Sequence, residues 1–290
     1  MNHRGEPTRM KITIDPRAAP VPRAGRSFES RNGVRAADRA LEILNLLASA
    51  DRVEWFLEEI ALGTDLPKST AHRLLETLSR RGFVEQGTRH GTYRLGLGAA
   101  VVGCMAIRTR RPSDDVHRML TASAAEVGDS VGLSVLEGTS AVVVDRAMSP
   151  RPLQWNLGVG ASMPAHVSAA GKVLLGSISD DAIRRLYATR DALEKKTART
   201  VSNVEELITD VRATRSQGCW IDDGELEVGL RCAAVPVRDN AGRLTHALGV
   251  SAPSSRATVD DLRGVVGALE RTALAISPHV TLVARERMAE

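Results

Sequence analysis

Hydrophobic residues in the first third of the chain recur with the period of amphipathic helices. One helical stripe is predicted within residues 36–49 and is formed by Ala40, Leu41, Ile43, Leu44 and Leu47. A second apolar stretch, residues 55–62, ends at Gly63, which suits a helix terminus. The pattern therefore predicts two short helices that each bury one face.

The segment LPKSTAHRLLETLSRRGF, residues 66–83, predicts a third helix with two unlike faces. Pro67 suits a first helical turn, and Gly82 suits the left-handed residue that ends a helix. The apolar face consists of Ala71, Leu74, Leu75 and Leu78. The polar face consists of Ser69, His72, Arg73, Glu76 and Arg80. Core packing accounts for the first face and leaves the second for another role. Within the polar face we expect Glu76 to pair with Arg73 or Arg80.

A predicted hairpin follows this helix. Residues 83–86 and 92–96 flank a turn at His90-Gly91 and have the composition of two paired strands. The turn at residues 63–66 is short enough to set the second and third helices at a steep angle. Three helices followed by a hairpin predict a winged helix-turn-helix.

The remainder of the chain alternates predicted strands and helices. Apolar strands at 131–136 and 141–146, and again at 232–239 and 244–252, predict two hairpins. Helix N-caps are predicted at Ser168, Ser179, Ser202 and Thr258, the last two with Glu205 and Asp261 as capping-box partners. These elements indicate an antiparallel sheet with flanking helices.

The chain is therefore predicted to be an α+β multidomain protein. Its predicted parts are a flexible basic tail (1–30), a winged helix-turn-helix domain (31–95), a linker helix (96–112) and an α+β domain (113–290). The linker helix carries Leu97, Val101, Val102 and Met105, which we expect to face a partner subunit.

Positive charge is concentrated in the first third. Residues 1–95 hold 16 lysines and arginines against 12 acidic residues, whereas the whole chain holds 39 against 35. The entire excess therefore lies in this part. Such localisation is typical of a polyanion-binding protein, although a solvated basic tail would give the same balance.

Composition favours a cytoplasmic protein. The three cysteines have no paired spacing, which suits a reducing compartment and argues against a disulfide framework. No run of 18 apolar residues exists, and the N-terminus lacks the apolar region of a secretory signal. We therefore expect no membrane association.

The polar face of the third helix fits the major groove of double-stranded DNA. Arg and Lys can donate to guanine edges or phosphates, and Ser and Thr can donate to phosphates. The predicted DNA-contacting residues are Lys68, Ser69, Thr70, His72, Arg73, Arg80, Arg89, His90 and Arg94. For the helix alone a solvated face is the commoner interpretation, but the preceding helix, turn, hairpin and charge excess together favour DNA binding.

Several segments resemble IclR-type bacterial transcriptional regulators. LPKSTAHRLLETLSRRGFVE followed by YRLGLG is similar to the DNA-binding domain of that family. MPAHVSAAGKVLL, IDDGELEVGLRCAAVPV and SAPSSR are similar to marker segments of its effector-binding domain. The resemblance runs in order from about residue 36 to the C-terminus. It implies a GAF-like domain that binds a small metabolite, often a carboxylate or aromatic acid, and dimers that often pair into tetramers.

The resemblance also implies the position of the ligand pocket. The matching positions are Ala169, Ala170, Asp222, Gly249 and Ser251, with Cys232 beside them. If Ser168 opens a helix, the backbone amides of Ala169 and Ala170 offer an anion site. Gly249 stands where some family members have a hydroxyl side chain, so the pocket is expected to be larger or to lack one polar contact.

Other chemistry is less well supported. The AGK segment lacks a P-loop pattern, because His166 and Val173 occupy the positions that need Gly and Ser or Thr. Cys232 with His166, Asp222 and Glu225 could form a nucleophile set or metal site, but a cysteine in an apolar strand is more often a buried, inert thiol.

Trp155 and Trp220 fit a core or a pocket wall equally well. No catalytic residue, metal ligand or cofactor is predicted.

Together these features predict a one-component transcription regulator, of the repressor type, whose operator binding responds to a small organic acid. A single helix reads few base pairs, so we expect a homodimer, or a dimer of dimers forming a homotetramer, on a near-palindromic operator. One alternative is a small-molecule enzyme or metal-binding sensor with the N-terminal domain as an adaptor. Another is a pure oligomerisation module.

Overall fold

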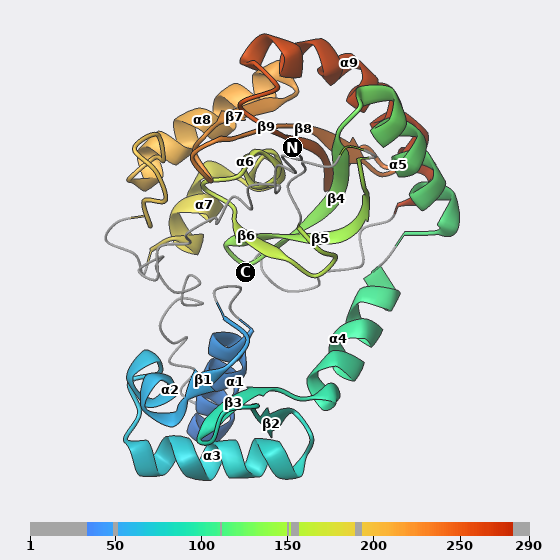
Figure 1. The fold of residues 1–290 in the computed structure, drawn as a ribbon. Helices are drawn as coiled ribbons and strands as arrows, with labels where there is room; N and C mark the ends of the chain where they lie inside the picture. Colours follow the sequence, from blue (N-terminus) through green and yellow to red (C-terminus); the bar gives the residue numbers. More distant parts are fainter. Residues whose placement is uncertain are drawn as a thin grey trace, which may run out of the picture. The chain divides into compact units, whose positions relative to one another are not determined.

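The computed structural model describes residues 34–48, 52–110, 112–149, 151, 157–188 and 193–280. The predicted basic tail and Trp155 lie outside these residues. The chain forms two compact units that divide between Val101 and Val102, and each is described by itself (Figure 1). Within the described ranges, none of the helices combines the length and the apolar character that crossing a membrane requires.

The N-terminal unit is a winged helix-turn-helix. Its helices are α1 (Arg35–Leu47), α2 (Leu57–Gly63) and α3 (Lys68–Arg80), followed by α4 (Leu97–Arg110), within which the two units divide. Its strands are β1 (Trp55–Phe56), β2 (Val84–Gln86) and β3 (Thr92–Leu95). The strands pair antiparallel in the order β1-β3-β2, so β2 and β3 form the predicted hairpin.

The core of this unit confirms most of the predicted apolar stripes. Ile43, Ile60 and Leu75 are fully buried and pack in one cluster. The prediction for Leu41 was wrong, because its side chain is 57% exposed. At about 100° per residue, Leu41 lies about 200° around the helix from Ile43, on the solvent side.

The second helix begins later than the apolar stretch predicted. Trp55 and Phe56 form a short strand that pairs with Tyr93 and Thr92, and α2 starts only at Leu57. The Phe56 amide donates to the Glu59 carboxylate at 2.9 Å, which satisfies one of the free amides at the helix start. The strand thus depends on a partner almost forty residues away in sequence, beyond the reach of local periodicity.

The C-terminal unit is built on one curved antiparallel sheet. Its strands are β4 (Ser130–Glu137), β5 (Ser140–Ala147), β6 (Ser162–Pro164), β7 (Trp220–Asp223), β8 (Leu230–Arg238) and β9 (Leu244–Pro253). They pair in the order β6-β5-β4-β9-β8-β7. The helices are α5 (Asp114–Val127), α6 (Ala169–Leu175), α7 (Asp180–Leu186), α8 (Val204–Gln217) and α9 (Val259–Ile276), and a short 3-10 turn, Ser277–His279, follows.

Helices cover the two faces of this sheet unequally. On one face α5 and α9 pack against β4, β8 and β9 in the main hydrophobic core. On the other, concave face α6 packs against β5, β8 and β9, with α8 next to it (Figure 1). The predicted α+β arrangement and both predicted hairpins are confirmed.

Three of the four predicted helix caps are confirmed and one was wrong. Ser168, Ser179 and Thr258 each accept a hydrogen bond from an amide in the first turn of their helix. For α8 the N-cap is Asn203, whose side chain accepts from the Glu206 amide at 2.9 Å. An Asn caps a helix about as well as a Ser, so the adjacent residue took the role.

Candidate functional sites

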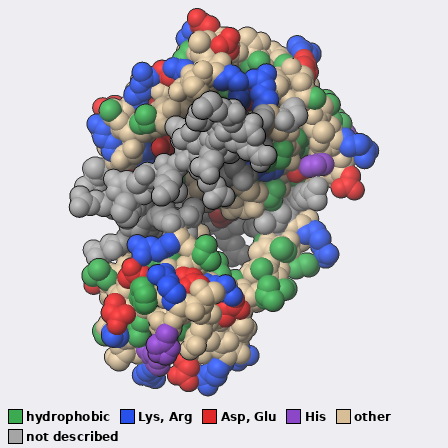
Figure 2. Space-filling model, viewed as in Figure 1, with side chains coloured by type: hydrophobic (Ala, Val, Ile, Leu, Met, Phe, Trp, Pro, Cys, Tyr) green, Lys and Arg blue, Asp and Glu red, His purple; other side chains and the backbone are tan. Residues whose placement is uncertain are grey.

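The polar face of α3 is free of the core. Ala71 and Leu75 on the opposite face are fully buried, whereas Lys68, Ser69, His72, Arg73 and Arg80 are exposed and Thr70 is half-buried. In Figure 2, Lys, Arg and His side chains gather on the surface of the N-terminal unit, interspersed with acidic ones. The helix therefore presents donors to solvent along its length, with Lys68 in its first turn.

Two acidic residues near α3 behave differently from each other. Lys68 donates to the Glu58 carboxylate of α2, and this hydrogen bond lowers the pKa of Glu58. Because both side chains are more than half exposed, solvent screens the pair and it can open readily. Glu76 does not form the pair expected from the sequence: in the described part of the chain it contacts neither Arg73 nor Arg80 as an ion pair. Arg73 is thus available to an outside partner.

The wing is held in shape by Glu54, which sequence reasoning missed. Its carboxylate accepts from the amide and the hydroxyl of Thr88, both at 2.7 Å, and from the Thr92 hydroxyl at 2.9 Å. These hydrogen bonds, led by the Thr88 amide, lower the pKa of Glu54 to about 2. Only the fold brings Glu54 to this turn, so no local signal in the sequence marks it.

The wing residues predicted to touch DNA are placed differently. His90 is exposed at the turn. The Arg89 guanidinium lies 5.1 Å from the centre of the Phe56 ring and 3.7 Å from the Glu54 carboxylate. Arg94 donates to Glu85 on the neighbouring strand at 2.7 Å. Arg94 therefore supports the hairpin, whereas His90 and Arg89 lie at its tip.

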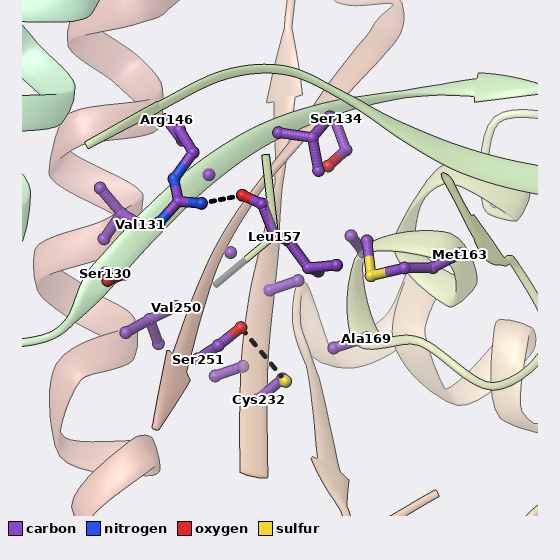
Figure 3. Close-up of a pocket in the computed structure, with 16 residues that line it drawn as sticks. Ser130, Val131, Ser134, Arg146, Leu157, Met163, Ala169, Cys232, Val250 and Ser251 are labelled. Carbon is purple, nitrogen blue, oxygen red and sulfur yellow. Dashed lines mark hydrogen bonds between the residues drawn. The ribbon is translucent and has the colours of Figure 1, made fainter. Parts of the chain in front are cut away.

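The concave face of the C-terminal sheet contains a cavity of about 60 Å³ beneath α6 (Figure 3). Its walls come from β4, β5, β8, β9, the start of α6 and Leu157. The lining residues are Ser130, Val131, Gly132, Ser134, Val143, Arg146, Leu157, Met163, Ala169, Ala170, Cys232, Ala233, Ala234, Gly249, Val250 and Ser251. The wall is thus mainly small and apolar, with three hydroxyls and one cation.

The structure brings five of the six predicted pocket residues to this cavity: Ala169, Ala170, Cys232, Gly249 and Ser251. Asp222 is not among the lining residues. It is fully buried on β7, where it is the strand partner of Cys232. Its carboxylate accepts from the Glu225 amide at 2.5 Å, and burial raises the pKa of Asp222 to about 7. Asp222 therefore lies behind the wall that Cys232 forms.

Cys232 has the properties of a structural thiol. Its Sγ donates to the Ser251 hydroxyl at 3.3 Å, and burial raises the pKa of Cys232 well above its usual value. A thiol that stays protonated is a poor nucleophile. His166, the base that a nucleophile set would need, has its Nε2 2.9 Å from the Glu194 carbonyl oxygen. No cluster of three metal-ligating side chains occurs among the described residues.

A buried ion-pair network supports α6 from behind. Lys172 is fully buried and donates to Asp210 on α8 at 2.7 Å and to Glu225. Its Nζ also lies 4.4 Å from the centre of the Trp220 ring, whose Nε1 donates to Glu225 at 3.0 Å. Trp220 thus belongs to the support of α6. The lysine of the AGK segment has a structural role that its lack of a P-loop pattern left open.

Comparison with known proteins places this arrangement in one class, the DNA-binding regulators with a separate effector domain. The family described as bacterial transcriptional regulator IclR C-terminal matches residues 109–278, and the IclR helix-turn-helix domain matches residues 36–87. The chain belongs to the IclR family of transcriptional repressors.

Individual relatives agree with this assignment. The chain is 32% identical over 229 residues to the acetate operon repressor of Salmonella typhimurium, covering 78% of this chain and 83% of that protein. An IclR transcriptional regulator from Alicyclobacillus acidocaldarius has 25% identity and a TM-score of 0.69, with 84% of this chain and 98% of that chain covered.

A third relative was solved with a bound small molecule. It is an IclR homologue from Microbacterium hydrocarbonoxydans in complex with 4-hydroxybenzoate, with 24% identity and a TM-score of 0.63, covering 83% of this chain and 97% of that chain. This similarity concerns the fold.

Proposed function

We propose that this protein is a one-component regulator that binds a near-palindromic operator through α3 and the wing and releases or tightens it when a small organic acid occupies the cavity beneath α6. The observation that supports DNA binding most directly is α3 itself. Its apolar face is buried by α1 and α2, and its exposed face carries Lys68, His72 and Arg73 in a family of helix-turn-helix repressors. An enzyme would not need such a face.

Operator contact is assigned to Lys68, Ser69, Thr70, His72 and Arg73 on α3, with Arg80, Arg89, His90 and Arg94 flanking them. The first residues of a recognition helix usually meet base edges, while flanking residues meet phosphates. Effector contact is assigned to Ala169, Ala170, Cys232, Gly249 and Ser251, which line the cavity. Asp222 acts on the ligand through the wall rather than by touching it.

DNA binding can be tested with the region upstream of the protein's own gene. We expect tight binding that weakens steeply with salt, because each phosphate contact releases a counterion. The variant Arg73→Ala should lose about 1–3 kcal/mol of operator binding if Arg73 reads a base. Fluorescence anisotropy at fixed salt measures this loss.

The matched control is Arg39→Ala, since Arg39 is an equally exposed arginine on α1, away from the α3 face. It should bind the operator within about twofold of the wild type. Equal losses for both arginines would mean that only net charge matters, and no operator binding by the folded wild type would refute the proposed function.

A further inference from the structure

Arg146 stands at one end of a row of cross-strand partners that forms the cavity floor. Arg146 on β5 pairs with Gly132 on β4, Gly132 pairs with Gly249 on β9, and Gly249 pairs with Ala234 on β8. Strand partners in register project to the same face of a sheet. Next to the long arginine side chain, the row therefore offers two positions without a side chain and one with a methyl group.

The glycines in this row create space for a ligand. A Cβ added at Gly132 would meet only the Asp145 carbonyl oxygen, at 3.9 Å, so any side chain there would extend into the hollow. The row thus leaves Arg146 facing a shallow trough on the concave side of the sheet (Figure 3).

The charge of the cavity wall is positive. Arg146 is the one ionised side chain among the lining residues of the described chain, and none of these residues is acidic. Its guanidinium lies on the cavity side of β5 and donates to the Leu157 carbonyl (Figure 3). Partial burial lowers the pKa of Arg146, but an arginine keeps its proton in proteins. A partly desolvated guanidinium binds a planar anion such as a carboxylate in a forked geometry.

The opposite edge of the cavity disfavours an anion. Behind Cys232 lies Asp222, and behind α6 two carboxylates, Asp210 and Glu225, surround a single lysine, Lys172. A carboxylate placed against α6 would face this acidic group across one layer of side chains. The electrostatic field therefore orients an acid with its charged end towards β5.

We propose that Arg146 binds the carboxylate of the effector and that the uncharged part of the molecule lies over Gly132 and Gly249 towards Ala169. This inference rests on the proposed function, since it takes the cavity to be the effector site. The volume of about 60 Å³ accommodates roughly four to six water-sized groups, which favours a short acid. The hydroxyls of Ser134 and Ser251 offer partners for a second polar group on the ligand.

Isothermal titration of paired acids and amides tests the proposal. The probes are acetate, propionate, lactate and benzoate, each with its uncharged amide. For the wild type, at least one acid should bind at least about tenfold more tightly than its amide, because a charge-assisted pair is lost in the amide. In Arg146→Gln this preference should disappear, while amide binding changes little.

Two further variants make the result specific. Arg238→Gln removes an equal charge from the exposed end of β8 and should keep the acid preference. If Arg146→Gln does not unfold cooperatively, Arg146→Lys decides, since it keeps the charge but loses the fork. It should weaken acid binding by at least about threefold and leave amide binding unchanged.

The proposal is overturned if the wild type binds none of the acids, or if Arg146→Gln keeps the preference for acid over amide. Operator binding is measured on the same samples. Intact operator binding together with either of these results would refute the role of Arg146 and leave the regulator assignment standing.

Discussion

At the scale of single residues, Asp222 carries the most unusual ionisation in the C-terminal unit. It is fully buried, and its Oδ2 has no hydrogen-bond partner among the described residues. Burial raises its pKa from 3.8 to about 7. Between these values the folded protein holds a proton that the unfolded chain releases, so this carboxyl makes the free energy of unfolding fall as the pH rises.

Asp222→Asn should remove this pH dependence. An Asn side chain keeps an acceptor for the Glu225 amide and cannot ionise. Relative to the wild type, the variant should therefore be more stable at about pH 8 than at about pH 5. Urea unfolding at the two pH values measures the difference, with the exposed Asp260→Asn as control. An identical difference at both pH values would show that Asp222 is ionised throughout.

Residues of the pocket differ in how far the sequence could reveal them. Ala169, Ala170, Cys232, Gly249 and Ser251 come from segments that resemble a known family, and the structure gathers them at one cavity. Arg146 lies outside those segments. Its position follows from a strand register that joins four strands far apart in sequence, which local spacing does not encode.

At the scale of elements, the cap of α8 shows how a local rule selected the wrong neighbour. Asn203 accepts from the Glu206 amide, while the Ser202 amide donates to the Glu206 side chain at 3.0 Å. Asn203→Ala should lower the free energy of unfolding by about 1 kcal/mol, the usual cost of losing a cap. Ser202→Ala should change it by less than about 0.5 kcal/mol, because its backbone contact remains.

Chemical denaturation followed by circular dichroism compares the two α8 variants. A larger loss for Ser202→Ala than for Asn203→Ala would restore the cap that the sequence predicted. The two residues are adjacent and both precede α8, so they form a matched pair.

Elements with strong local signals were predicted well. Helix α3 begins after Pro67 and ends before Gly82, which has a φ of 75°, as its flanking residues indicated. Strand β1 was missed, because its two residues are held by hydrogen bonds from β3 rather than by their own pattern. Glu54 was missed for the same reason, since its partners Thr88 and Thr92 lie across a long loop.

At the scale of the whole molecule, regulation needs two copies of α3 at a fixed spacing. A single recognition helix contacts few base pairs, so a near-palindromic operator calls for a dimer. Helix α4 offers a surface for this contact. Leu97, Val101 and Met105 follow one another at four-residue steps, and with Val102 they are 46–79% exposed in the single chain. An apolar stripe of this kind is costly in water and favours burial against a second copy.

Val101→Glu should separate the copies and weaken operator binding together. A carboxylate at the centre of the apolar stripe would have to lose its hydration in a dimer, which is unfavourable without a partner. Analytical ultracentrifugation should show a dimer dissociation constant at least about tenfold higher, and anisotropy should show a matching loss on a full palindrome but little change on a half-site. Thr109→Glu adds the same charge near the exposed end of α4 and serves as control. Unchanged association in Val101→Glu would exclude α4 as the dimer surface.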